Sequence, residues 1–191
     1  EEVKGVYVPF WMYDGAASGS VQFHATTVHK YTSGDYEITE TSHYDVRRAG
    51  SISFEKIPVD ASSKMPDDYM DSIEPYDYAE LKPFSTAYLP GFLADKYDVS
   101  VENSRERADK RCAGSLVSAL ESTVSNYTTC NETSRDICLK RGKVHYALLP
   151  VWILNTKWEG KDFLFAMNGQ TGKLVGNLPV STKRVVGLFA A

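Results

Sequence analysis

The sequence predicts an α+β fold in which hairpins form a mainly antiparallel β-sheet and one long amphipathic helix packs on that sheet. Runs of β-branched and aromatic residues, separated by glycine-containing turns, fill the first and last parts of the chain. One long stretch with helical periodicity lies between them. The length of 191 residues, with 42% hydrophobic and 24% charged residues, is typical of a globular chain. We therefore expect a single domain over residues 1–184.

The N-terminal part of the chain carries an all-β pattern. Residues 5–13 are apolar, β-branched and aromatic, which predicts a strand, and Pro9 favours an edge or a bulge within it. The small, glycine-rich stretch 15–20 predicts a turn. A hairpin is expected around Ser33-Gly34-Asp35. The further strands expected in this part cover residues 21–31, 35–48 and 51–59.

The middle of the chain predicts two helices. Pro66 and the two aspartates after it suit the first turn of a short helix over 66–74, because carboxylates favour the positive end of the helix dipole. A long amphipathic helix is expected over 101–125, with Ser100 as its N-cap. Its apolar stripe recurs about every four residues and comprises Ala108, Cys112, Leu116, Leu120 and Val124, with Ala113 and Val117 beside it.

The β pattern returns near the C-terminus, with strands expected at 144–156, 162–168 and 173–180. Three segments also share an aliphatic-Pro-x-aromatic pattern, and they begin at Val8, Leu89 and Leu149. The first and third share Pro-x-Trp, which indicates either an internal duplication of a hairpin unit or two separate core strands. In both cases we expect Trp11 and Trp152 in the core rather than as ligand platforms.

Charge is unevenly distributed along the chain. The formal net charge of −4 arises from −9 over the first 99 residues and +5 over the last 92. Net acidity argues against a dedicated nucleic-acid-binding protein. Four basic residues lie in the first half of the long helix: Arg105, Arg107, Lys110 and Arg111. They either pair within the fold and with solvent, or form a docking face for anionic lipid or nucleic acid.

Two histidines and an aspartate form the one group of residues in the sequence that suits metal binding. If Ser33-Gly34 forms a two-residue turn, His24 lies directly opposite His43, and Asp45 shares the face of His43. Because imidazoles and carboxylates ligate transition metals, these three side chains form a candidate metal site. A Gly34-Asp35 turn would shift the register and separate the imidazoles. The alternative interpretation is polar residues on a solvated face of the hairpin.

The remaining motifs predict structure rather than catalysis. Cys112 lies within the apolar helix stripe and is expected to be a buried, inert thiol. Cys130 and Cys138 bracket a segment compatible with a hairpin disulfide, which requires an oxidising compartment. The glycines of 169–173 predict turns, because their spacing does not match a phosphate-binding loop. The sequence contains no GxSxG, HExxH or GxGxxG motif, so we assign no catalytic residue.

Several longer stretches carry a family resemblance: GVYVPFWMYD, TETSHYDVRRAGSISFEKIPVDASSKMPDDYMDSIEPYDY, AYLPGFLADKYDV, LLPVWILNTKW and FAMNGQTGKLVGNLPVS. Together they cover almost the whole chain. In these stretches the chain resembles uncharacterised bacterial membrane proteins with an N-terminal zinc ribbon of the transcription-factor-IIB type. The resemblance implies a Cys₄ zinc ribbon before this domain and a transmembrane helix after it, both outside these 191 residues. It implies no activity.

The C-terminal residues agree with this expected architecture. Lys183 and Arg184 precede the apolar residues 185–191, which we expect to begin a transmembrane segment. Basic residues flank the cytoplasmic end of such segments. We therefore expect the domain at the cytoplasmic face of a bacterial cell membrane, with its three cysteines as free thiols.

These expectations favour a non-catalytic binding or scaffold module of a membrane-anchored protein, with an unknown protein partner. We expect no cofactor in this segment, with zinc only in the ribbon outside it, and we do not expect nucleic acid as the partner of this domain. Two alternatives remain. One is an enzyme with a metal-assisted site near His24 and His43, and the other is docking of the basic helix face to anionic lipid or nucleic acid.

Overall fold

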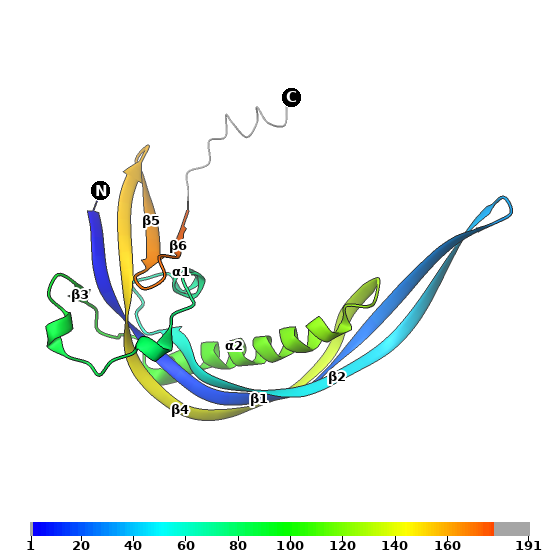
Figure 1. The fold of residues 1–191 in the computed structure, drawn as a ribbon, viewed down its shortest axis with the longest axis horizontal. Helices are drawn as coiled ribbons and strands as arrows, with labels where there is room; N and C mark the ends of the chain where they lie inside the picture. Colours follow the sequence, from blue (N-terminus) through cyan, green and yellow to red (C-terminus); the bar gives the residue numbers. More distant parts are fainter. Residues whose placement is uncertain (1, 178–191) are drawn as a thin grey trace. The chain divides into compact units, whose positions relative to one another are not determined.

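The computed structural model describes residues 2–177 (Figure 1). The chain divides into two compact units, which are described separately. Unit 1 comprises residues 1–11, 59–104 and 146–191, and unit 2 comprises residues 12–58 and 105–145. The predicted start of a transmembrane segment at 185–191 lies outside the described residues. The expectation of one domain over 1–184 stays a prediction.

One six-stranded sheet contains all the strands of the described residues. The strands are β1 (Glu2–Ser33), β2 (Tyr36–Asp60), β3 (Leu93–Ala94), β4 (Thr129–Trp158), β5 (Lys161–Asn168) and β6 (Leu174–Gly176). Their order is β2-β1-β4-β5-β6, and β3 pairs with β1. Strands β4, β5 and β6 pair antiparallel, whereas β3 lies parallel to β1. This mainly antiparallel sheet, with one long helix, confirms the predicted α+β class.

The helices follow the predicted capping signals. The short helix predicted over 66–74 is α1 (Asp67–Ser72), and Pro66, which was predicted in its first turn, instead takes an extended conformation directly before it. The long helix α2 (Val101–Glu121) continues into the 3-10 turn η3 (Ser122–Val124). At its start, the Asn103 backbone N–H donates to the Ser100 Oγ at 3.3 Å, which confirms Ser100 as the N-cap. Two further 3-10 turns, η1 (Tyr78–Glu80) and η2 (Thr86–Tyr88), lie in unit 1.

Unit 2 consists of β1, β2 and β4 segments with helix α2 along one face (Figure 1). The predicted helix stripe is buried against this face, so Leu116 contacts a core that also contains Val21 and Phe23. Each such buried side chain contributes about 1.5–3 kcal/mol of hydrophobic stabilisation. The buried cluster is formed by Ala17, Val21, Phe23, Ala25, Val46, Leu116, Val117, Leu120 and Val124.

The predicted turn at 15–20 is wrong, because these residues continue strand β1. The glycines in this stretch allow strand β4 to lie close to β1. A Cβ on Gly15 would lie 2.9 Å from the Lys140 carbonyl oxygen, and one on Gly19 would lie 2.1 Å from that of Asp136. Small residues therefore allow two strands to pack closely here. A run of small residues is compatible with both a turn and a closely packed strand, so composition alone did not separate the two.

The two strands predicted at 35–48 and 51–59 form one strand, β2. Gly50 lies within it and faces helix α2, since a Cβ there would lie 3.4 Å from Leu120 Cδ2. The irregular position comes later, at Lys56, whose φ of 56° marks a local distortion of the strand. The all-β opening of the chain therefore contains two long strands rather than three or four short ones.

Unit 1 combines the N-terminal end of β1 with β3, the C-terminal end of β4, β5, β6 and α1. The strands predicted at 144–156, 162–168 and 173–180 correspond to the end of β4, to β5 and to β6, as far as residue 177. Fully buried side chains in this unit include Val8, Phe10, Met70, Ile73 and Val151.

Both predicted core tryptophans lie in unit 1 and are half-buried. The Trp11 indole N–H donates to the Val99 carbonyl at 2.8 Å, and the ring lies among Tyr97 and Tyr146. The Trp152 ring lies 5.5 Å from that of Phe92. Both rings therefore pack within aromatic clusters, on the neighbouring strands β1 and β4.

Candidate functional site

The predicted cluster of His24, His43 and Asp45 forms on the outer face of the unit 2 sheet. His24 lies between Phe23 and Ala25, which are buried under helix α2, so strand alternation directs His24 to the opposite face. Its Nε2 lies 3.2 Å from Nδ1 of His43. The two rings are stacked, with centroids 5.3 Å apart. Nδ1 of His24 lies 3.5 Å from a carboxylate oxygen of Asp45.

The hairpin turn that produces this cluster is the one that we expected to break it. Strands β1 and β2 are joined by Gly34-Asp35, with Gly34 at a φ of 61°. In that register His24 faces Asp45, and His43 is its diagonal neighbour on the same face. The expectation that this turn separates the imidazoles is wrong, because long ring side chains reach a diagonal neighbour.

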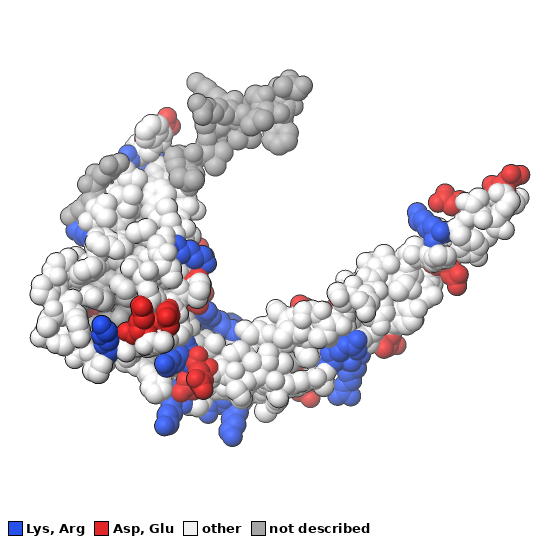
Figure 2. Space-filling view, in the orientation of Figure 1, with Lys and Arg blue, Asp and Glu red and all other residues white. Residues whose placement is uncertain are grey.

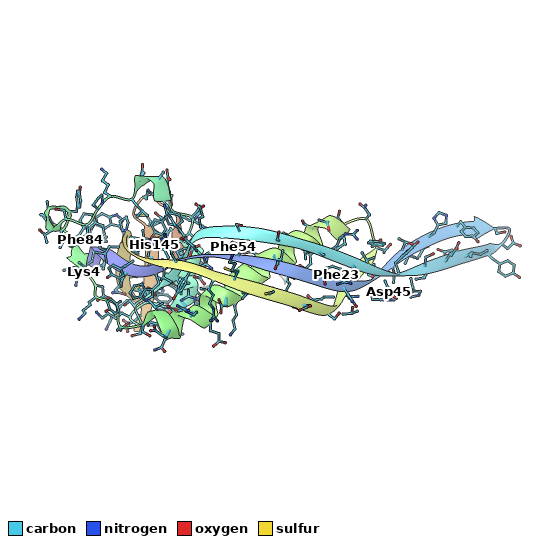
Figure 3. All side chains as sticks on the ribbon, turned by 90° about the horizontal axis from the view of Figure 1, so that it is seen from below. Lys4, Phe23, Asp45, Phe54, Phe84 and His145 are labelled. Atoms are coloured by element: carbon cyan, nitrogen blue, oxygen red, sulfur yellow. The ribbon has the colours of Figure 1, made fainter. Side chains whose placement is uncertain are left out.

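The cluster is open to solvent. The side chain of His24 is 44% exposed and that of Asp45 is 99% exposed, and Asp45 is labelled on the ribbon in Figure 3. Among residues 2–177, no group of three or more His, Cys, Asp or Glu side chains is arranged to hold a metal ion. The three predicted residues therefore form a contacting imidazole pair with an adjacent carboxylate, and metal binding stays a hypothesis.

The four basic residues of helix α2 differ in their surroundings. Lys110 is exposed and pairs with Glu106 at 2.7 Å, whereas Arg105, Arg107 and Arg111 are half-buried. Arg111 donates to the Pro58 carbonyl at 2.6 Å. On the face drawn in Figure 2, lysine and arginine side chains lie among aspartates and glutamates. The interpretation as a basic docking face stays a prediction.

A small cavity lies in unit 2 between helix α2 and strands β1 and β4. Its volume is about 30 Å³, and Asp14, Arg105 and Cys112 are among the residues that line it. The Arg105 Nε is buried there without a hydrogen-bond partner in the described residues. Burial raises the pKa of the Cys112 thiol, which agrees with the predicted inert cysteine. Such a volume suits one or two waters rather than a substrate.

Asp14 makes polar contacts that no sequence pattern predicted. The Lys56 backbone N–H donates to its Oδ1 at 2.9 Å, and His145 Nε2 lies 3.1 Å from its Oδ2. The hydrogen bond from Lys56, followed by that of His145, holds the pKa of Asp14 below its usual value. Only the pairing of β1 with both neighbouring strands brings these residues together, so local sequence carries no signal for it.

The turn after β5 contains a second unpredicted polar anchor, Asn168, which is fully buried. Its side-chain amide donates to the carbonyl oxygens of Ile73 and Pro75. Its Oδ1 accepts the backbone N–H groups of Gln170 and Thr171. The glycine-containing turn therefore fastens the segment after α1, which agrees with the prediction of a structural turn rather than a phosphate site.

The three cysteines are free thiols. Cys130 and Cys138 both lie on strand β4, because that strand begins at Thr129 rather than near residue 144. Eight residues of extended strand separate them by roughly 26 Å, far beyond the Cα separation of a disulfide. The interpretation of this segment as a disulfide-closed hairpin is therefore wrong.

Across residues 2–177, no helix combines the length and the apolar character that a membrane span requires. The basic pair Lys183 and Arg184 lies outside the described residues. The structure therefore leaves the predicted membrane tether untested.

Comparison with known proteins identifies a bacterial relative. No protein-family model matches the chain, and no solved structure matches it. Over 190 of its 191 residues, the sequence is 43% identical to the uncharacterized protein YdjG of Bacillus subtilis (strain 168). The chain spans 56% of the length of that protein. The comparison names no activity, so the chain is similar, along its whole length, to part of a bacterial protein of uncharacterized function.

Proposed function

We propose that the chain is a non-catalytic binding module whose recognition element is the outer end of the β1–β2 hairpin. This segment, residues 29–40, is named the arm. Every residue of the arm except Ile38 is exposed. An exposed two-stranded segment gains little stability from its own contacts, so a role in binding explains its size better than a role in folding.

The arm lies beyond the last contacts of β1 with the β4 side of the sheet. The Thr128 backbone N–H donates to the Thr26 carbonyl at 2.7 Å, and the Val28 N–H donates to Thr128 Oγ1 at 3.0 Å. In the described part of the chain, only β1 and β2 continue past this point (Figure 1). Both strands of the arm therefore carry an open edge, to which another strand can add.

The two faces of the arm differ in chemistry. Strand alternation places His29, Tyr31, Tyr36 and Ile38 on the face that helix α2 covers farther along the sheet. The opposite face carries Lys30, Thr32, Glu37 and Thr39. The arm is therefore an amphipathic ribbon.

The aromatic face of the arm is the observation that carries the proposal. Tyr31 is 43% exposed and Tyr36 is 76% exposed. A sheet normally covers its apolar face with another layer, as α2 does over the core of unit 2. Tyrosine also suits interfaces, because its ring is apolar and its hydroxyl hydrogen-bonds to water or a partner. The partner proposed here is a protein that packs on this face.

The two alternative functions have weaker structural support. The His24 and His43 pair lies on an open sheet face, whereas metal-assisted enzymes usually enclose their substrate in a concave site. The cavity of unit 2 is lined by other residues. Of the four helix cations, three are half-buried. Neither arrangement supports catalysis or lipid docking as directly as the arm supports protein binding.

We further propose the wider setting from the sequence resemblance alone. The module is held at the cytoplasmic face of a bacterial membrane by a helix outside this chain, and it works together with a zinc ribbon that precedes it. The Pro-x-Trp segments on β1 and β4 are proposed to be copies of one ancestral unit. Lys183 and Arg184, before an apolar stretch, support the tether.

Site-specific photo-crosslinking in the native host tests the binding proposal. A benzophenone side chain at position 36 replaces Tyr36 on the aromatic face, and the matched control replaces its neighbour Glu37 on the polar face. We expect a discrete covalent adduct with a protein from position 36 and little or none from position 37. Equal adducts from both positions, or none from position 36, would contradict the assignment of the aromatic face as the binding surface.

A further inference from the structure

We propose that His24 and His43 form a binding site for a divalent transition-metal ion of the zinc class, with Asp45 as the partner that orients His24. The inference is independent of the arm, because the three side chains lie on the opposite face of the sheet from Tyr31 and Tyr36. It departs from the expectation that this segment holds no metal.

The distance between the two imidazoles fits a shared metal ion. Nε2 of His24 and Nδ1 of His43 are 3.2 Å apart. Two nitrogens that bind one tetrahedral zinc ion at about 2.0–2.1 Å lie about 3.3–3.4 Å from each other. The spacing of the nitrogens therefore needs little change, and a rotation of each ring away from the line between them directs both lone pairs to one ion.

Asp45 provides the supporting contact that metal-binding histidines usually have. Its carboxylate lies 3.5 Å from Nδ1 of His24, on the nitrogen that does not face His43. A carboxylate favours the tautomer in which Nδ1 carries the proton, and that tautomer leaves the Nε2 lone pair for the metal. With a metal ion bound at Nε2, His24 would complete a carboxylate–histidine–metal arrangement.

The proton balance of binding follows from the same contact. When His24 carries its proton on Nδ1, toward Asp45, its Nε2 accepts a hydrogen bond from Nδ1–H of His43 in the metal-free chain. Metal binding requires the Nδ1 lone pair of His43, so His43, which is exposed to solvent, then carries its proton on Nε2. No net proton is released when both imidazoles are neutral.

The site supplies two protein ligands, since no larger group of metal-binding side chains occurs among residues 2–177. Water completes the coordination. Binding is therefore expected to be weaker than in a structural four-ligand zinc site, and selective for metals that prefer imidazole over calcium or magnesium.

Isothermal titration of the tag-free 191-residue chain with Zn²⁺ at neutral pH tests the proposal. We expect one ion per chain, and a loss of affinity of about tenfold or more in either His24→Ala or His43→Ala, because the remaining imidazole is a lone ligand. The double variant should be little worse than either single one. Asp45→Asn should weaken binding by about tenfold or more, as loss of an outer-shell carboxylate does.

His29→Ala is the matched control, since His29 lies on the same strand, is exposed and contacts Tyr31 on the other face. It should bind Zn²⁺ as the unmodified chain does, and Ca²⁺ should give no heat of binding at this site. Far-UV circular dichroism verifies that each variant is folded. Absence of zinc binding by the unmodified chain, or equal losses in His29→Ala and His24→Ala, would overturn the proposal.

Discussion

Asp14 illustrates how one carboxylate connects three strands of unit 2. It lies on β1, accepts the Lys56 N–H from β2 and contacts His145 from β4. Because these hydrogen bonds stabilise the ionised form, its pKa is lower in the folded state than in the unfolded chain. The resulting stabilisation is complete above the unfolded pKa and is lost as the pH falls through the folded pKa.

Asp14→Asn keeps an acceptor for the Lys56 N–H but loses the charge, so it should reduce stability at neutral pH by about 1 kcal/mol. The variant should also lose part of the acid sensitivity of the unmodified chain. Urea unfolding at neutral and acidic pH measures both effects. Asp162→Asn controls for the loss of a charge, because that carboxylate is 80% exposed. An Asp14→Asn variant with the unmodified pH dependence would show that this contact is not made in solution.

Asn168 makes a comparable connection in unit 1. All of its side-chain hydrogen-bonding capacity contacts backbone groups, and the residue is fully buried. Asn168→Ala leaves those backbone groups without partners, which should cost about 3 kcal/mol. Chemical denaturation measures the loss.

Gln170→Ala is the comparison for Asn168→Ala. Gln170 belongs to the same turn but is exposed, and its amide contacts Asp77 and Glu80 at the surface. Its replacement should cost less than about 1 kcal/mol, because water replaces the lost contacts. Equal costs for the two variants would contradict the anchoring role of Asn168.

At the scale of elements, the amphipathic helix was the part most accessible to prediction. Its stripe and its N-cap are local patterns, and Leu116, Leu120 and Ser100 take the positions that those patterns require. The start of β4 was not predictable in the same way. Residues 129–143 are mostly polar, and only Cys130, Ile137 and Leu139 pack on the core. Their strand conformation depends on pairing with β1, which is a non-local cause.

In the candidate site too, local sequence predicted some features, whereas others depend on pairing between distant parts of the chain. Sequence placed His24, His43 and Asp45 on one hairpin, but it could not fix the turn, and the register depends on that choice. The contacts of Asp14 and Asn168 join residues far apart in the chain, so no local pattern predicted them. Whether the Pro-x-Trp segments are duplicated stays a prediction, although two of them lie on the neighbouring strands β1 and β4.

The glycine-rich stretch of β1 allows a test of how closely β1 and β4 pack. Gly19→Ala places a Cβ 2.1 Å from the Asp136 carbonyl oxygen, so the two strands must separate or distort. We expect a loss of about 2–4 kcal/mol, in the upper range for single substitutions. Gly114→Ala on helix α2 is the control, because a Cβ there meets nothing within 4 Å. It should stabilise the chain by about 0.5–1 kcal/mol, and thermal unfolding distinguishes the two outcomes. A neutral Gly19→Ala would refute the close packing of β1 on β4.

At the scale of the whole molecule, stability and recognition are assigned to different residues. The buried residues of unit 2 gather under helix α2, and unit 1 has its own buried set around Phe10, Met70 and Val151. The arm adds almost no buried surface to either. Ordering the arm costs conformational entropy, and the arm adds no core to offset that cost. We therefore expect a role in binding, rather than in stability, for this segment.

The most direct test of the account removes the arm and measures folding and binding together. Residues 29–40 are replaced by Asn-Gly, which joins Val28 to Thr41 through a two-residue hairpin turn. We predict a free energy of unfolding within about 1 kcal/mol of that of the unmodified chain, because the arm lacks a core. We also predict that a benzophenone at position 27, which is present in both chains on the face of Tyr31, forms the protein adduct in the intact chain but not in the shortened one. Retention of that same adduct by the shortened chain would contradict the central claim that the arm is the recognition element.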